Sequence, residues 1–199
     1  MLTLIMNHTI AIDGMPENFF VNLFATMYIG MAPLTSIAAI IAEEKEKNTL
    51  RVLIMSNVRP YEYLLGIGIY VWVICMIGAV VICTAGGYKP QGNITFMSIM
   101  AIGILASLLA GATIGTYSHT QMMATSVTLP VMMFFSFMPM LSLFNTTIAK
   151  IAKFTFTEQI SLGQVTNLQL KAENICIIIV NILIAAVLFS ITYKKCGLA

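Results

Sequence analysis

The sequence predicts an all-α integral membrane protein with five transmembrane helices. Hydrophobic residues make up 59% of its 199 residues and charged residues only 9%. A soluble domain of this length needs more charge to cover its surface. Uncharged apolar runs of about 20 residues recur along the chain, and a helix of that length crosses about 30 Å of hydrocarbon.

The five apolar runs define the expected spans in order. The third and fourth share an uncharged run over residues 90–149, which is too long for one helix, and "YSHTQ" (117–121) is its polar break. We expect a single membrane domain over residues 1–199, with spans at about residues 20–42, 64–85, 96–116, 125–144 and 174–193.

The distribution of Lys and Arg predicts the orientation. With five spans, alternate loops share a side of the membrane. One side holds Lys45, Lys47, Arg51, Arg59, Lys194 and Lys195 in short segments, and the other holds Lys89, Lys150, Lys153 and Lys171 over longer loops. The positive-inside rule places the C-terminus in the cytoplasm and the N-terminus outside the cell. An extracellular N-terminus without a signal peptide suggests that an upstream helix is missing, is supplied by a partner, or was lost when the gene was delimited.

The loop before the last span contains an apolar pattern of its own. Ile148, Ile151 and Ala152 follow a spacing of three and four residues, with Lys150 and Lys153 off that face. This pattern predicts a short amphipathic helix at the extracellular membrane interface. The alternative is a solvated loop with chance spacing.

Nearly half of the charge lies in one loop, because 8 of the 18 charged residues fall between Glu43 and Glu62. "EEKEKN" is rich in helix formers, so the first span is expected to continue as helix into the cytoplasm. Leu50, Leu53 and Ile54 then form an apolar face, and Pro60 ends the helix. Such a surface predicts docking of a soluble partner. The alternative is that these residues only cap two spans.

The residues that several kinds of chemistry require are absent from the sequence. The five expected spans contain no Asp, Glu, Lys or Arg, which argues against an ion-coupled carrier. The sequence has no H-E-x-x-H, no G-x-S-x-G and no Gly-Lys pair for a Walker A loop. The cysteines are scattered and no basic cluster contains aromatics. We therefore expect no enzyme activity, no cofactor, no metal and no nucleic-acid partner, with membrane lipid as the surroundings.

The third span carries a stripe of small residues, each four positions apart: Gly103, Ser107, Gly111 and Gly115. Small residues at this spacing let another backbone approach closely. The stripe predicts helix packing within the chain, a contact with another subunit, or a wall that slides during gating.

The charged loop also resembles a known signature. "EEKEKNTLRVLIMSNVRPYEYLLG" (43–66) is similar to the cytoplasmic loop of ABC-2 type permeases, in which an acidic E-x-E-x-G-T-L stretch precedes an apolar segment and a turn. The matching positions are Glu44, Glu46, Thr49, Leu50, Leu53, Val58 and Glu62, with Asn48 in place of the usual glycine. Family members usually have six spans, so this chain resembles a short form without the first.

The resemblance implies a function. The chain would be a membrane-spanning permease subunit of an ATP-driven exporter of a small molecule or peptide, such as a drug or an antimicrobial peptide. A second permease chain, identical or different, would complete the pathway, and ATP and Mg²⁺ would bind to a separate ATPase subunit. A cytoplasmic coupling helix between the first two spans would contact that ATPase through Glu43, Glu44, Glu46, Asn48, Thr49, Leu50, Arg51, Leu53, Ile54 and Val58. The alternatives are a truncated structural or regulatory subunit and, less in keeping with the spans, an ion-coupled carrier.

Overall fold

The computed structural model describes residues 19–47, 60–86, 90–165 and 172–195. These residues form α2 (Phe19–Glu46), α4 (Pro60–Gly86), α5 (Pro90–Tyr117), α6 (Gln121–Ser142), α7 (Thr146–Ala152), α8 (Phe156–Val165) and α9 (Ala172–Lys195). No strand occurs in these ranges. The helices α2, α4, α5, α6 and α9 are long and apolar enough to cross a membrane, which confirms the predicted all-α fold with five spans.

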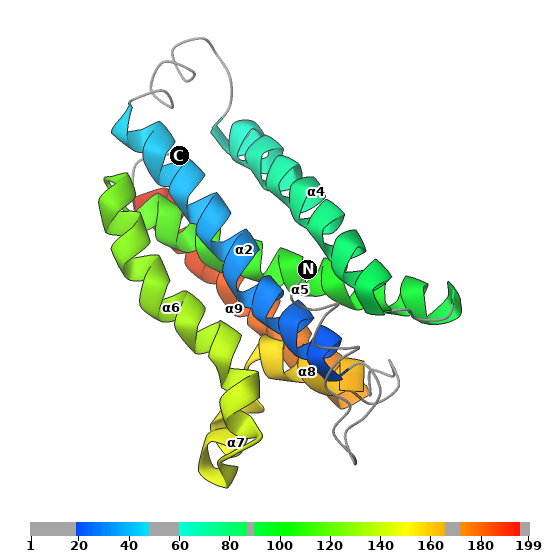
Figure 1. The fold of residues 1–199 in the computed structure, drawn as a ribbon. Coiled ribbons are helices and arrows are strands. Elements are labelled where there is room, and N and C mark those ends of the chain that lie inside the picture. The colour runs from blue at the N-terminus through cyan, green and yellow to red at the C-terminus, as the bar shows by residue number, and fades with distance from the viewer. Residues whose placement is uncertain (1–18, 48–59, 87–89, 166–171, 196–199) are drawn as a thin grey trace.

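The long helices form a bundle centred on α2 and α5 (Figure 1). Helix α2 packs against α4, α5, α6 and α8, and α9 packs against α5 and α8. Helices α2, α5 and α9 finish at one end of the bundle, and α4 and α6 begin there. We call this end the charged end. The opposite end carries α7 and α8.

Local sequence explains several helix starts. Helices α4 and α5 begin at Pro60 and Pro90, where the missing N–H of proline costs nothing. Helix α6 begins at Gln121, four residues before the expected span, because the Thr120 side chain caps it and accepts a hydrogen bond from Met123 N at 3.2 Å. The "YSHTQ" break therefore supplies a helix cap as well as a turn.

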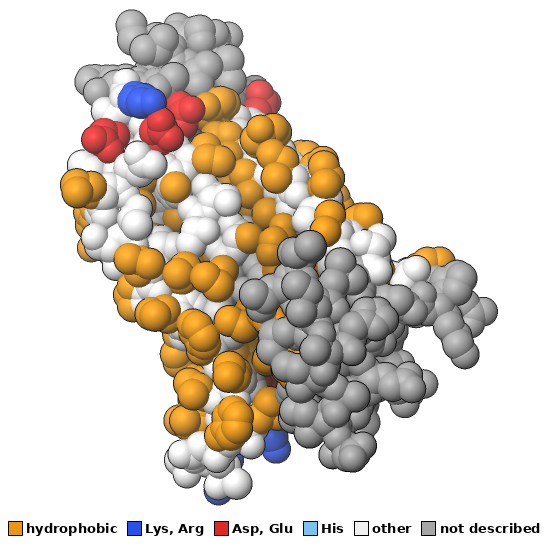
Figure 2. Space-filling model, in the orientation of Figure 1, with side chains coloured by type: hydrophobic (Ala, Val, Ile, Leu, Met, Phe, Trp, Pro, Cys, Tyr) orange, Lys and Arg blue, Asp and Glu red, His pale blue; other side chains and the backbone are white. Residues whose placement is uncertain are grey.

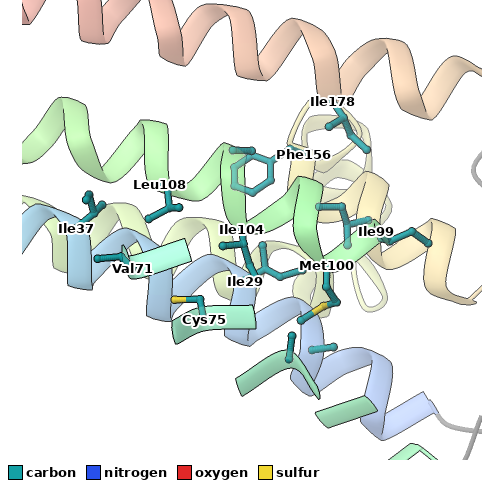
Figure 3. Packing of buried hydrophobic residues seen from close by; sticks show 14 of the residues in the cluster. Ile29, Ile37, Val71, Cys75, Ile99, Met100, Ile104, Leu108, Phe156 and Ile178 are labelled. Atoms are coloured by element: carbon teal, nitrogen blue, oxygen red, sulfur yellow. The ribbon is translucent and has the colours of Figure 1, made fainter. Parts of the chain in front are cut away.

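The core lies where α2, α4, α5, α8 and α9 meet (Figure 3). Ile29 of α2 and Ile104 of α5 are fully buried, and Phe156 of α8 packs in the same cluster. The outer faces of α4 and α9 instead expose large apolar residues such as Ile69 and Leu183. Hydrophobic side chains cover much of the surface between the two ends (Figure 2), as expected of a surface in contact with lipid.

The segment before the last span contains two short helices. Asn145 caps α7 by accepting a hydrogen bond from Thr147 N at 2.9 Å, and Ala152 is buried while Ile151 is exposed. Helix α7 covers the segment in which a short helix was predicted, and its position at a membrane interface stays a prediction. Helix α8 was not expected from the sequence, and it turns back into the bundle to contact α2, α5, α6 and α9.

Candidate functional site

The charged end of the bundle begins with the stem of α2. The helix continues to Glu46, as predicted, and an ion pair of 2.5 Å joins Lys47 Nζ to Glu43 Oε1 one turn earlier. Both side chains are largely exposed, so the pair contributes little to stability. Figure 2 shows acidic and basic side chains grouped at this end. The stem therefore presents charge to the solvent beside the apolar bundle.

Three consecutive side chains at the end of α2 contact three different helices. The Tyr63 hydroxyl in α4 donates a hydrogen bond to the Glu44 carboxylate. Lys45 Nζ donates to the backbone carbonyl of Thr116 in α5. The carboxylate of the third residue, Glu46, accepts from Gln121 N in α6 at 2.8 Å. We call Glu44, Lys45 and Glu46 the α2 junction.

The charges of the α2 junction match the helix ends that they contact. The carbonyl of Thr116 belongs to the last turn of α5, where unpaired carbonyls give the helix its negative end. The N–H of Gln121 belongs to the first turn of α6, where unpaired amides give the positive end. Lys45 and Glu46 therefore hold the turn between α5 and α6 from both sides, each with a favourable charge.

The other residues predicted to contact an ATPase lie mostly outside the described residues. This applies to Asn48, Thr49, Leu50, Arg51, Leu53, Ile54 and Val58. Of the predicted set, the structure places Glu43, Glu44 and Glu46 in the last turns of α2. The coupling helix thus stays a prediction, whereas the stem that leads into it is described.

The small-residue stripe of α5 faces α2 in the same chain. Ser107 Oγ donates to the carbonyl of Ile29 at 2.6 Å. A Cβ added at Gly111 would lie 2.4 Å from the carbonyl oxygen of Leu34, and one at Gly115 would lie 2.9 Å from Ile41 Cβ. At the opposite end of the stripe, a Cβ at Gly103 would lie 2.6 Å from Ile160 Cδ1 in α8. The stripe thus lets α2 and α5 approach backbone to backbone.

A cavity of about 610 Å³ lies between α2, α4, α5 and α9. Ile41, Gly68, Trp72, Leu108 and Tyr193 are among its lining residues, and none of the lining residues is charged. The indole N–H of Trp72 is turned to the carbonyl of Ala101 in α5, at 3.4 Å. The volume is in the range of small-molecule sites, and the walls favour an apolar ligand.

The opposite end contains a buried acid. Glu158 in α8 is only 7% exposed, and its Oε1 accepts a hydrogen bond from Ser142 Oγ at 2.9 Å. Burial raises the pKa of the Glu158 carboxyl, although the hydrogen bond from Ser142 opposes this shift. In the same region, Asn181 Nδ2 of α9 donates to the carbonyl of Phe154 at 2.9 Å. These contacts anchor the α7–α8 segment to α6 and α9.

Sequence reasoning missed two of these residues. Lys45 was counted only for its charge, although its position between two matched acids could have indicated a role in the stem. Glu158 was read as part of a loop, and the polar run "TFTEQ" (155–159) gave no sign of burial. Among the described residues, no group of three or more His, Cys, Asp or Glu could hold a metal ion.

Comparison with known proteins identifies the family. No curated protein and no solved structure gives a significant match. A family model described as "ABC-2 family transporter protein" matches residues 7–194, nearly the whole length of the chain. With five apolar helices long enough to span a bilayer, the chain is a multi-pass membrane protein. It belongs to the ABC-2 family of transporter proteins.

Proposed function

We propose that the chain is the membrane-spanning permease subunit of an ATP-driven exporter. The observation that carries this proposal is the family match over residues 7–194, which covers all five spans. ATP and Mg²⁺ bind to a separate ATPase subunit, and a second permease chain, identical or different, completes the pathway. Hydrolysis on the partner supplies the energy, and this chain supplies the path.

In this proposal the charged end faces the cytoplasm. The greater density of Lys and Arg in the short segments at this end supports that orientation. The loop that follows α2 then lies on the side where ATP is available. Its apolar residues Leu50, Leu53 and Ile54 contact the ATPase, and its acidic stem holds the contact beside the bundle.

The substrate in this proposal is a small molecule or peptide with apolar surface. The cavity between α2, α4, α5 and α9 supports this choice because no charged side chain lines it. Burial of apolar ligand surface there would contribute roughly 25 cal/mol per Å². Two glycines of α4 offer a matched test, because a Cβ at Gly66 or Gly68 would meet no atom within 4 Å, and only Gly68 lines the cavity.

The docking role is tested by purifying the tagged chain from membranes of its own cell. We expect an ATPase subunit to co-purify, and Leu53→Asp to remove it by placing a charge on the docking face. Ile151→Asp is the matched control, because Ile151 is an exposed apolar residue at the opposite end of the bundle. Equal recovery of the ATPase with both variants would refute the docking face.

The cavity is tested with the one tryptophan of the chain, Trp72, which lines it. Energy transfer from Trp72 to pyrene, an uncharged aromatic probe, should saturate with probe concentration in the purified chain. Gly68→Leu should reduce this transfer by filling the cavity, and Gly66→Leu should not. If the two variants give the same transfer, pyrene does not enter the cavity.

A further inference from the structure

The α2 junction connects the charged loop to the rest of the bundle. Residues 48–59 follow α2 in the sequence, and three successive side chains near the end of α2 contact α4, α5 and α6. A force on the loop therefore reaches three neighbouring helices within one turn of α2.

Two contacts of the α2 junction are made to the two sides of one turn, the turn between α5 and α6. Thr116 is the penultimate residue of α5, and Gln121 is the first residue of α6. Between them lies the short turn that contains Ser118, which is fully buried and whose hydroxyl donates to the carbonyl of Ile114. The turn is thus tied both to its own helix and to α2.

We infer that Lys45 and Glu46 are positioning residues that make α6 move with α2 when an ATPase displaces the charged loop. This inference rests on the proposed function. Lys45 holds the end of α5 and Glu46 holds the start of α6, so a shift of the α2 stem carries the α5–α6 turn with it. Glu46 acts here by an inward hydrogen bond to α6, in addition to any contact with the partner.

A movement of α6 would also displace the helix that its far end contacts. Ser142, the last residue of α6, donates to the buried Glu158 of α8. Helix α8 in turn packs against α2, α5 and α9. A displacement that begins at Gln121 would therefore travel along one continuous helix to the α7–α8 segment on the other side of the membrane.

The test uses the permease–ATPase complex in lipid nanodiscs with spin labels at exposed serines. Ser36 of α2, Ser126 of α6 and Ser190 of α9 are all exposed, so Ser→Cys at these sites changes little. The four native cysteines are replaced by alanine. One label pair reports the distance from α2 to α9 and the other the distance from α6 to α9, each without nucleotide and with ADP trapped by vanadate after ATP hydrolysis.

In the wild type both distances should change between the two nucleotide states. In the double variant Lys45→Met, Glu46→Ala the α2–α9 change should persist and the α6–α9 change should be lost. Glu46→Gln should retain the α6–α9 change, because its amide oxygen still accepts from Gln121 N. Lys150→Met with Lys153→Ala is the control, since both are exposed charged residues at the opposite end of the bundle.

The outcomes separate this inference from the function on which it rests. If the double variant keeps the wild-type α6–α9 change, Lys45 and Glu46 do not link the two helices and the inference is wrong. If it shifts the α6–α9 distance equally in both nucleotide states, the residues have only a static structural role and the inference is again wrong. If neither distance changes with nucleotide in the wild type, the proposed ATP-driven function itself is overturned.

Discussion

Gly111→Ala tests the close approach of α2 and α5. The added Cβ would lie 2.4 Å from the carbonyl oxygen of Leu34 and 2.5 Å from Ile37 Cγ2, whereas ordinary van der Waals contact begins at 3.4 Å. Because the nearest atom belongs to the backbone, no side-chain rotation relieves the clash. The two helices must separate by about 1 Å locally, which forfeits a quarter to a half of the dispersion energy of each affected contact.

The expected cost is about 1–3 kcal/mol, the usual range for overpacking a well-packed site. Unfolding of the purified chain in detergent can be followed by the fluorescence of Trp72, whose indole faces α5. At about 2–4 °C per kcal/mol, the clash alone should lower the midpoint by roughly 2–12 °C. Part of this loss is offset because Ala favours a helix over Gly by about 1 kcal/mol.

Gly66→Ala separates the clash from helix propensity. It makes the same chemical change in a helix, but nothing lies within 4 Å of the new Cβ. We expect its unfolding midpoint to match or exceed that of the wild type. If Gly111→Ala is as stable as Gly66→Ala, the two helices are not in backbone contact at this position, and the packing described for the α5 stripe is wrong.

Two further substitutions probe polar contacts. Because burial raises the pKa of Glu158, the folded chain binds more protons than the unfolded chain, and this residue's contribution to stability falls as pH rises through the raised pKa. Glu158→Gln should keep the acceptor for Ser142 and flatten the pH dependence of the unfolding midpoint above the ordinary pKa of a glutamate, about 4.3; an unchanged slope would contradict it. Tyr28→Phe removes the hydrogen bond from the Tyr28 hydroxyl to the carbonyl of Cys75 at 3.0 Å and should cost about 0.5–1.5 kcal/mol of unfolding free energy. Tyr70→Phe, at a site 63% exposed to the membrane, should cost nothing measurable, and equal costs would refute the α2–α4 contact.

The spans could be predicted because bilayer thickness alone sets their length and composition. Each of the five apolar runs became a long helix, and the helix formers of "EEKEKN" correctly indicated that the first continues beyond the apolar run. The boundaries were less predictable. The start of α6 depends on the cap at Thr120, and a threonine in a polar turn does not by itself reveal that it caps a helix.

Contacts between distant segments were not accessible from the sequence. The spacing of Gly103, Ser107, Gly111 and Gly115 predicts a close helix neighbour, but it does not say which helix, and the structure identifies α2. Helix α8 begins without a regular apolar pattern because residues 156–160 are all buried among several helices, so both faces of this first part meet protein. Glu158 looks like a solvated acid until α8 folds back into the bundle.

The α2 junction shows the same division between local and distant information. That Glu44, Lys45 and Glu46 lie at the end of a helix follows from composition and helix propensity. That each contacts a different helix depends on how α4, α5 and α6 are arranged around α2. The family signature directed attention to the acids of this stretch, and only the structure brings Lys45 into it.

The most direct test of the proposed function is ATP hydrolysis in a preparation that is purified by a tag on this chain alone. The tagged chain, extracted from native membranes and washed, is given Mg²⁺ and ATP, and release of phosphate is measured with and without vanadate. The proposed function predicts vanadate-sensitive hydrolysis that co-purifies with the wild type and is absent when the tag is on Leu53→Asp. A chain that purifies as a stable protein without any ATP-hydrolysing subunit would contradict it.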